Sequence, residues 1–165
     1  MSDEKFDSLI MKVIQETKSN PLPSMISIKS HGEYLSNLPK KVFAKFEKQC
    51  PEEIKVVQKY HPINVENFLQ FDDNNNPDLN QALQNYRNCF EKHNRDYLNY
   101  ENKFGKEMKG LKIALNTCIS KCSEKLVKKT DNEVESCVRE CVHTSFDNTD
   151  VLIKERIKIY SQFFP

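Results

Sequence analysis

Apolar residues follow a helical rhythm through most of the second half of the chain. From Asp78 onward they recur at steps of three and four, which places them on one face of an α-helix. No proline interrupts this run, so the pattern predicts one helix over residues 78–127. Most of this helix would have no core of its own, and its apolar stripe is therefore expected to need another surface. The stripe comprises Leu79, Leu83, Tyr86, Phe90, His93, Tyr97, Tyr100, Phe104, Met108, Leu111 and Leu115.

A second helical run follows a short polar segment centred on residues 128–132. Its spacing predicts a helix over residues 132–163, with Asp131 or Asn132 as the N-terminal cap. The polar stretch 147–150 is a poor helix former and is expected to bend this helix. Two helices joined by so short a turn predict an antiparallel hairpin. The second stripe comprises Val134, Val138, Val142, Phe146, Ile153, Ile157, Tyr160 and Phe164.

Prolines divide the first half of the chain into shorter segments. Apolar spacing predicts a helix over residues 3–18, and the segment 24–38 is interpreted as an irregular or extended connection. Pro39 and Pro51 are each expected in the first turn of a helix, where the missing N–H costs no helical hydrogen bond. These two helices would end at Gln49 and Tyr60.

A polar stretch at residues 72–77 separates the two halves. We therefore predict an all-α fold in which a helical arm over residues 1–77 precedes a helical hairpin over residues 78–165. In the hairpin, residue 95 would face residue 164, so the part of the first helix before residue 95 has no partner there. Either the arm folds back on it, or other chains cover it.

Composition narrows the classes of function. Hydrophobic residues make up 38% of the chain, below the usual figure of about 45–50% on a slightly different residue count, so burial against partners is expected. A net charge of +1 gives no case for nucleic acid or a membrane surface as partner. No apolar run approaches about 18 residues, so no transmembrane segment is expected. The acidic N-terminus lacks the features of a matrix presequence or a secretory signal.

Four of the six cysteines form two Cys-x3-Cys pairs, Cys118 with Cys122 and Cys137 with Cys141. Residues four apart share one face of a helix, and facing residues of an antiparallel hairpin have position numbers with a constant sum. Cys118 with Cys141 and Cys122 with Cys137 have the same sum, so one reversal near residues 129–130 predicts two nested disulfides. The crossed couples would be out of step by about 5 Å, which disulfide geometry hardly tolerates.

Other chemistry stays open for the cysteines. Two such pairs could supply four thiolates to a zinc ion, although Cys-x2-Cys is the commoner zinc spacing. A thiol-exchange enzyme favours Cys-x-x-Cys at a helix N-terminus, whereas these thiols lie inside helices. Cys50 and Cys89 are isolated and are either ordinary thiols or a third bridge between the arm and the long helix. His93 lies on the aromatic stripe and is interpreted as a packed interface histidine.

The twin Cys-x3-Cys pattern resembles the small Tim family of the mitochondrial intermembrane space. The resemblance covers the core from Cys118 to Cys141 and its flanking helices, about residues 80–163, but not the long N-terminal extension. It implies the same nested bridges, assembly into six-membered rings of alternating subunits, and import without a presequence. Family members shield hydrophobic inner-membrane precursors in transit. The resemblance also implies trapping by a disulfide relay, for which Leu111, Leu115 and Ile119 could supply the signal around Cys118.

We therefore expect a non-enzymatic subunit of the intermembrane space, peripheral to the inner membrane. It would assemble with other small-Tim-like subunits in a hexamer-like ring and dock as a structural or accessory component on a large inner-membrane complex, a translocase or a respiratory complex. The alternative is a soluble ring chaperone that escorts hydrophobic inner-membrane precursors. No catalytic residue, metal or cofactor is expected. The residues expected at subunit interfaces or against a client are Leu83, Tyr86, Phe90, Tyr97, Phe104, Leu111, Phe146, Ile153, Ile157 and Tyr160.

Overall fold

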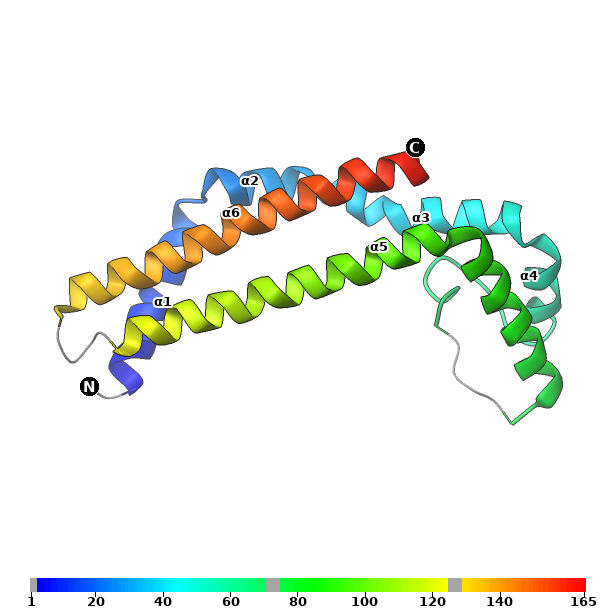
Figure 1. Cartoon of the computed structure of the whole chain (residues 1–165), viewed down its shortest axis with the longest axis horizontal. Helices are drawn as coiled ribbons and strands as arrows, with labels where there is room; N and C mark the ends of the chain where they lie inside the picture. Colours follow the sequence, from blue (N-terminus) through cyan, green and yellow to red (C-terminus); the bar gives the residue numbers. More distant parts are fainter. Residues whose placement is uncertain (1–2, 71–74, 125–128) are drawn as a thin grey trace. The chain divides into compact units, whose positions relative to one another are not determined.

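The computed structural model describes residues 3–70, 75–124 and 129–165, and it confirms the all-α prediction (Figure 1). Within those ranges the chain forms no strand. Its helices, in chain order, are α1 (Asp3–Ser19), α2 (Pro23–Ser30), α3 (Gly32–Gln49), α4 (Pro51–Gln58), α5 (Pro77–Glu124) and α6 (Asp131–Phe163).

The segment interpreted as irregular is helical, so that prediction is wrong. Helices α2 and α3 fill it and are separated only by His31. Pro39 lies inside α3 rather than in its first turn. Helical spacing continues across the proline, because Leu38, Val42 and Phe46 are all buried on one face of α3. Burial of that face outweighs the single backbone hydrogen bond that a proline inside a helix removes.

The two long helices lie close to their predicted bounds. Helix α5 ends at Glu124, and the predicted continuation over residues 125–127 lies outside the described residues. Helix α6 passes through residues 147–150 without interruption. Pro51 opens α4 as predicted, and that helix ends at Gln58.

The chain packs as two compact units that differ from the predicted division at residue 77. Unit 1 consists of Met1–His31 and Lys103–Arg156, and unit 2 consists of Gly32–Asn102 and Ile157–Pro165. Both long helices contribute a segment to each unit. The arm is divided between the two units: its part up to His31 packs in unit 1, and its part from Gly32 packs in unit 2.

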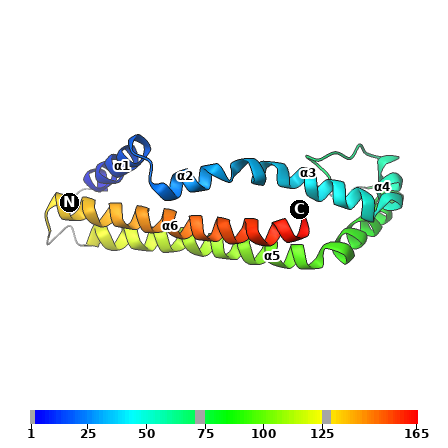
Figure 2. The ribbon, with the colours of Figure 1, turned by 90° about the horizontal axis from the view of Figure 1, so that it is seen from above.

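Unit 1 is built on the hairpin, whose segments of α5 and α6 lie side by side in opposite directions (Figures 1 and 2). Helix α1 packs against this pair and contributes Val13, which is fully buried. The other buried residues of this core are Cys122, Val138 and Cys141. Half-buried apolar residues packed around them are Phe6, Ile10, Leu115, Cys118, Ile119, Cys137 and Val142.

Ion pairs fix the direction of α1 along α6. The Lys12 ammonium lies 3.0 Å from Glu135 Oε2. One turn further, Arg139 Nη2 lies 2.8 Å from Glu16 Oε2. Both pairs join positions 123 apart in the sequence. A constant difference, rather than a constant sum, means that α1 and α6 run parallel.

Thr130 caps the N-terminus of α6, so the prediction of Asp131 or Asn132 is wrong. The Glu133 N–H donates to Thr130 Oγ1 at 3.4 Å, and the Thr130 N–H donates to Glu133 Oε2 at 3.2 Å. This reciprocal pair is a capping box, which satisfies two backbone donors that would otherwise lack partners. Asp131 instead pairs with Lys5 of α1 at 2.8 Å.

Unit 2 covers the first part of the aromatic stripe with the chain's own arm. The fully buried Phe46 of α3 packs edge-on against Tyr86 and Phe90 of α5, with ring centroids 4.8 and 5.0 Å away. Of the two alternatives predicted for this part of the stripe, the structure shows the first: the arm folds back on it. The buried core comprises Leu38, Val42, Phe46, Cys50, Ile54, Val57, Phe68, Leu79, Ala82, Leu83, Tyr86, Phe90, Tyr97, Tyr160 and Phe164.

The end of α6 meets α5 in unit 2 close to the predicted register. The Tyr97 ring lies 5.1 Å from Phe164 and 5.4 Å from Tyr160, measured between centroids. Lys45 of α3 closes this end of the core. Its ammonium donates to the Phe163 carbonyl at 3.0 Å and lies 5.1 Å from the centroid of the Phe164 ring.

Helix α5 bends at Asn94, which sequence analysis did not predict. The backbone there leaves the helical region, with φ −127° and ψ 27°. The buried Asn94 amide donates to the Phe90 carbonyl at 3.0 Å and to Gln49 Oε1 at 2.9 Å. The side chain therefore occupies a carbonyl that a regular helix would pair with a backbone N–H. It also ties the bend to the last residue of α3.

Candidate functional site

The two Cys-x3-Cys pairs of unit 1 form two nested disulfides. Cys118 bonds to Cys141 and Cys122 bonds to Cys137, with Cα–Cα separations of 5.8 Å in both bridges. These are the couples that the hairpin register predicts. The bridges lie one turn apart, and Cys122 Sγ is 3.7 Å from Cys141 Sγ. The sulfur atoms therefore form one compact cluster between α5 and α6.

The third bridge joins the arm to the long helix in unit 2. Cys50, the residue between α3 and α4, bonds to Cys89 of α5, with a Cα–Cα separation of 6.2 Å. Cys50 is fully buried and Cys89 is half-buried. All six cysteines are thus bonded. Of the two alternatives that the sequence left open for Cys50 and Cys89, the structure has the bridge.

Most of the residues expected at an interface lie in the chain's own core. The buried ones are Leu83, Tyr86, Phe90, Tyr97, Ile153 and Tyr160, and the half-buried ones are Phe104, Leu111, Phe146 and Ile157. Their role against a partner or client stays a prediction, but burial leaves the first group little surface for one. The most exposed large hydrophobic side chains in the described residues are Val151, at 66%, and Ile113, at 63%. Sequence reasoning missed both because they lie off the apolar stripes.

His93 is exposed in this chain, so its packing at an interface stays a prediction. It lies one turn after Cys89 on α5, and a ring nitrogen is within 4.8 Å of the sulfur atoms of Cys50 and Cys89. The spacing of four residues between Cys89 and His93 was the sequence signal for this cluster. That spacing alone does not predict the cluster, because Cys50 lies 39 residues before Cys89 in the sequence.

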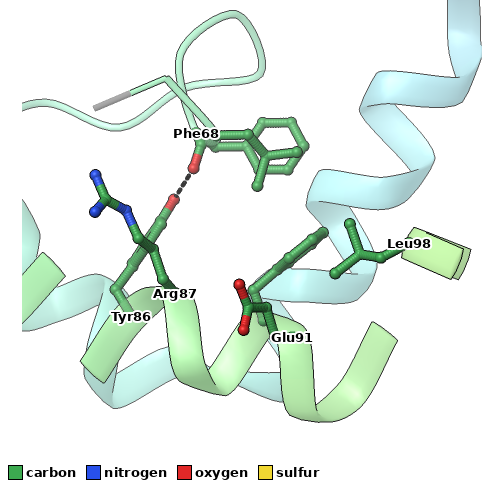
Figure 3. A pocket seen from close by; sticks show the side chains of 7 residues that line it. Phe68, Tyr86, Arg87, Glu91 and Leu98 are labelled. Atoms are coloured by element: carbon green, nitrogen blue, oxygen red, sulfur yellow. Dashed lines mark hydrogen bonds between the residues drawn. The ribbon is translucent and has the colours of Figure 1, made fainter. Parts of the chain in front are cut away.

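Unit 2 also holds a pocket of about 280 Å³ with largely apolar walls (Figure 3). The Tyr86 hydroxyl donates to the Phe68 backbone carbonyl beside it. Burial raises the pKa of Tyr86 far above its ordinary value, so this hydroxyl stays protonated. The pocket lining combines apolar side chains with one basic and one acidic residue, Arg87 and Glu91. The lining residues are Phe68, Leu69, Tyr86, Arg87, Phe90, Glu91 and Leu98.

In unit 1 the arm keeps two carboxylates of α6 ionised. A hydrogen bond from the Lys12 ammonium, followed by one from Arg139, lowers the pKa of Glu135. The Ser27 hydroxyl of α2 and then Lys154 lower the pKa of Asp150. Ser27 and Asp150 have the same separation in sequence as Lys12 and Glu135, so α2 continues the register of α1 along α6. These charges join the arm to α6.

Comparison with protein-family models, with curated proteins and with solved structures found no match to this chain. None of the helices in the described ranges combines the length and apolar character needed to cross a bilayer. The observed features define a class by construction alone: an all-α protein built on a disulfide-stapled helical hairpin whose N-terminal arm packs back on it.

Proposed function

We propose that this chain is a non-enzymatic, small-Tim-like subunit of the mitochondrial intermembrane space. In this role it assembles with other hairpin subunits and serves as a structural component of a large complex at the inner membrane. The observation that carries the proposal is the pair of nested bridges between α5 and α6, on a twin Cys-x3-Cys frame. Disulfides persist in oxidising compartments and are rare in the cytosol.

The burial of the aromatic stripe favours a structural role over a carrier role. A chaperone for hydrophobic precursors has to expose apolar side chains to its client. Here Tyr86, Phe90 and Tyr97 are covered by the chain's own helices and loops in unit 2. The stripe thus stabilises this chain rather than a passenger.

Contacts with other subunits have to use apolar side chains of α5 and α6 that the arm does not cover. Ile113 on α5 and Val151 on α6 are the best candidates in unit 1, because each exposes more than half of a large apolar side chain. Single exposed hydrophobic residues are common on monomers, so these two positions need a direct test. Ile26 of α2, which is 60% exposed but lies on the arm, provides a matched control.

Fractionation of mitochondria from the native cells tests the proposal. We expect the protein to stay with one large complex after mild detergent extraction. Release by salt without detergent, as a small ring, would support the chaperone alternative instead. Recovery outside mitochondria would overturn both. The double variant Ile113→Glu/Val151→Glu is expected to lose the large complex while keeping its disulfides, whereas Ile26→Glu is expected to keep it.

A further inference from the structure

Three metal-ligating side chains meet in unit 2, away from the hairpin. The sulfur atoms of Cys50 and Cys89 and a ring nitrogen of His93 all lie within 4.8 Å of one another. Cys89 and His93 sit one turn apart on α5 and so present their side chains on one face of the helix. Cys50 approaches from the junction of α3 and α4. Two separate elements therefore bring the three donors together.

We propose that reduction of the Cys50–Cys89 bridge converts this cluster into a binding site for a thiophilic divalent cation such as zinc. Zinc bonds to thiolate sulfur at about 2.3 Å and to imidazole nitrogen at about 2.0–2.1 Å. Tetrahedral bonds of those lengths separate the ligand atoms by roughly 3.4–3.8 Å, which is inside the present 4.8 Å limit. After reduction, the two sulfur atoms move apart to the tetrahedral spacing, and the imidazole has at most about 1.3 Å to close.

The surroundings suit a site with one open coordination position. Cys50 is fully buried, whereas His93 is exposed. His93 and Asp96 also line a pocket of about 270 Å³, so water reaches the histidine side of the cluster. Two thiolates, a neutral imidazole and a divalent cation carry no net charge together, so the buried side of the site is not left with an uncompensated charge. Three protein ligands and a water complete four-coordination.

The two states exchange by a balanced reaction. A low-molecular-weight disulfide accepts two electrons from the metal-bound thiolates of Cys50 and Cys89. The products are the Cys50–Cys89 bond, two small-molecule thiolates and the released cation. The same residues thus hold either a covalent link between the arm and α5 or a metal ion. This proposal is independent of the function proposed above.

Cobalt(II) is the probe for the test, because thiolate ligands give it a charge-transfer absorption band. The four hairpin cysteines form a second sulfur cluster and have to be removed from the measurement. The full chain therefore carries Cys118→Ser, Cys122→Ser, Cys137→Ser and Cys141→Ser, and is reduced with a phosphine under anaerobic conditions. We expect one cobalt ion per chain, displacement by zinc, and loss of the band when a low-molecular-weight disulfide is added.

Substitution of His93 decides whether its imidazole is a ligand of the bound metal. In the four-serine background, His93→Gln is expected to weaken cobalt binding by more than about 100-fold, beyond what an outer-shell residue costs. His143→Gln, a half-buried histidine of α6, is expected to leave it unchanged. Equal binding by both variants, or no thiolate band in a folded four-serine chain, overturns the proposal. If that chain loses its helical circular dichroism, the number of cobalt ions bound by the reduced natural sequence decides. There His93→Gln is expected to bind one ion fewer per chain than His143→Gln, and equal numbers overturn the proposal.

Discussion

Removal of the Cys50–Cys89 bridge tests how strongly this bridge stabilises the packing of the arm on α5 in unit 2. The perturbation is the double substitution Cys50→Ala/Cys89→Ala, which avoids placing a serine hydroxyl at the fully buried position 50. The bridge spans a sequence separation of 39, against 23 and 15 for the hairpin bridges. In the loop-closure picture these separations correspond to about 4, 3.4 and 3 kcal/mol at room temperature. The Cys50–Cys89 bridge is therefore expected to stabilise the chain most.

The distribution of tyrosines gives this test a local probe. The chain has six tyrosines and no tryptophan, and Tyr34, Tyr60, Tyr86, Tyr97, Tyr100 and Tyr160 all belong to unit 2. Tyrosine fluorescence therefore reports the unfolding of that unit. In urea without reductant, we expect the double alanine variant to lose about 4 kcal/mol of unfolding free energy. That is a large share of the roughly 5–15 kcal/mol typical of a domain.

A matched variant separates the bridge from general damage. Cys118→Ala/Cys141→Ala removes a hairpin bridge in unit 1 and is expected to shift the tyrosine transition less. A loss below about 1 kcal/mol for Cys50→Ala/Cys89→Ala would refute the reasoning, because it falls outside the usual range of about 2–4 kcal/mol. An equal effect of both variants on the tyrosine signal would also refute it, since the two bridges would then not act on separate units.

Three further perturbations follow from the packing. Phe46→Ala removes a fully buried ring between Tyr86 and Phe90. It is expected to lower the free energy of unfolding by about 3–5 kcal/mol, measured by urea unfolding with tyrosine detection. Val56→Ala, at an exposed position, is expected to change the same free energy by less than about 0.5 kcal/mol. Thr130→Ala breaks the capping box of α6 and is expected to cost about 1 kcal/mol in far-ultraviolet thermal unfolding; an unchanged melting temperature would argue against the cap. The pKa of Glu135 is lowered in the folded state, so its stabilising effect is complete above its ordinary pKa and is lost as the pH falls below about 4.3. Glu135→Gln is expected to reduce the acid-dependent loss of unfolding free energy. If the unfolding free energy of the variant falls with pH as steeply as that of the natural sequence, the assignment to Glu135 is wrong.

The sequence was sufficient for features that repeat or that obey a simple register. The apolar stripes of α5 and α6 predicted both helices, and the spacing of Cys118, Cys122, Cys137 and Cys141 predicted couples that the structure joins. These predictions depend only on helix geometry and on one chain reversal, so no distant contact had to be known.

Features that depend on tertiary contacts could not be read from the sequence. Pro39 suggested a helix start because proline favours a first turn, but burial of the α3 face carried the helix through it. The bend at Asn94 depends on Gln49, a residue of another helix. The bridge from Cys50 to Cys89 likewise depends on the arm folding back. The interface residues were assigned from the apolar stripe alone, and the stripe does not show how much of it the arm covers in unit 2.

The order of charges on α1 also guards against docking in the wrong orientation. Toward the C-terminus, the docking positions of α1 are basic and then acidic, Lys12 and Glu16, whereas those of α6 are acidic and then basic, Glu135 and Arg139. Turned end for end about the same centre, α1 would set Lys12 against Arg139 and Glu16 against Glu135. A slip of one helical turn would also bring Lys12 to Arg139. Each error would replace attraction by repulsion, so four side chains define the polarity of α1 on α6 against its nearest alternatives.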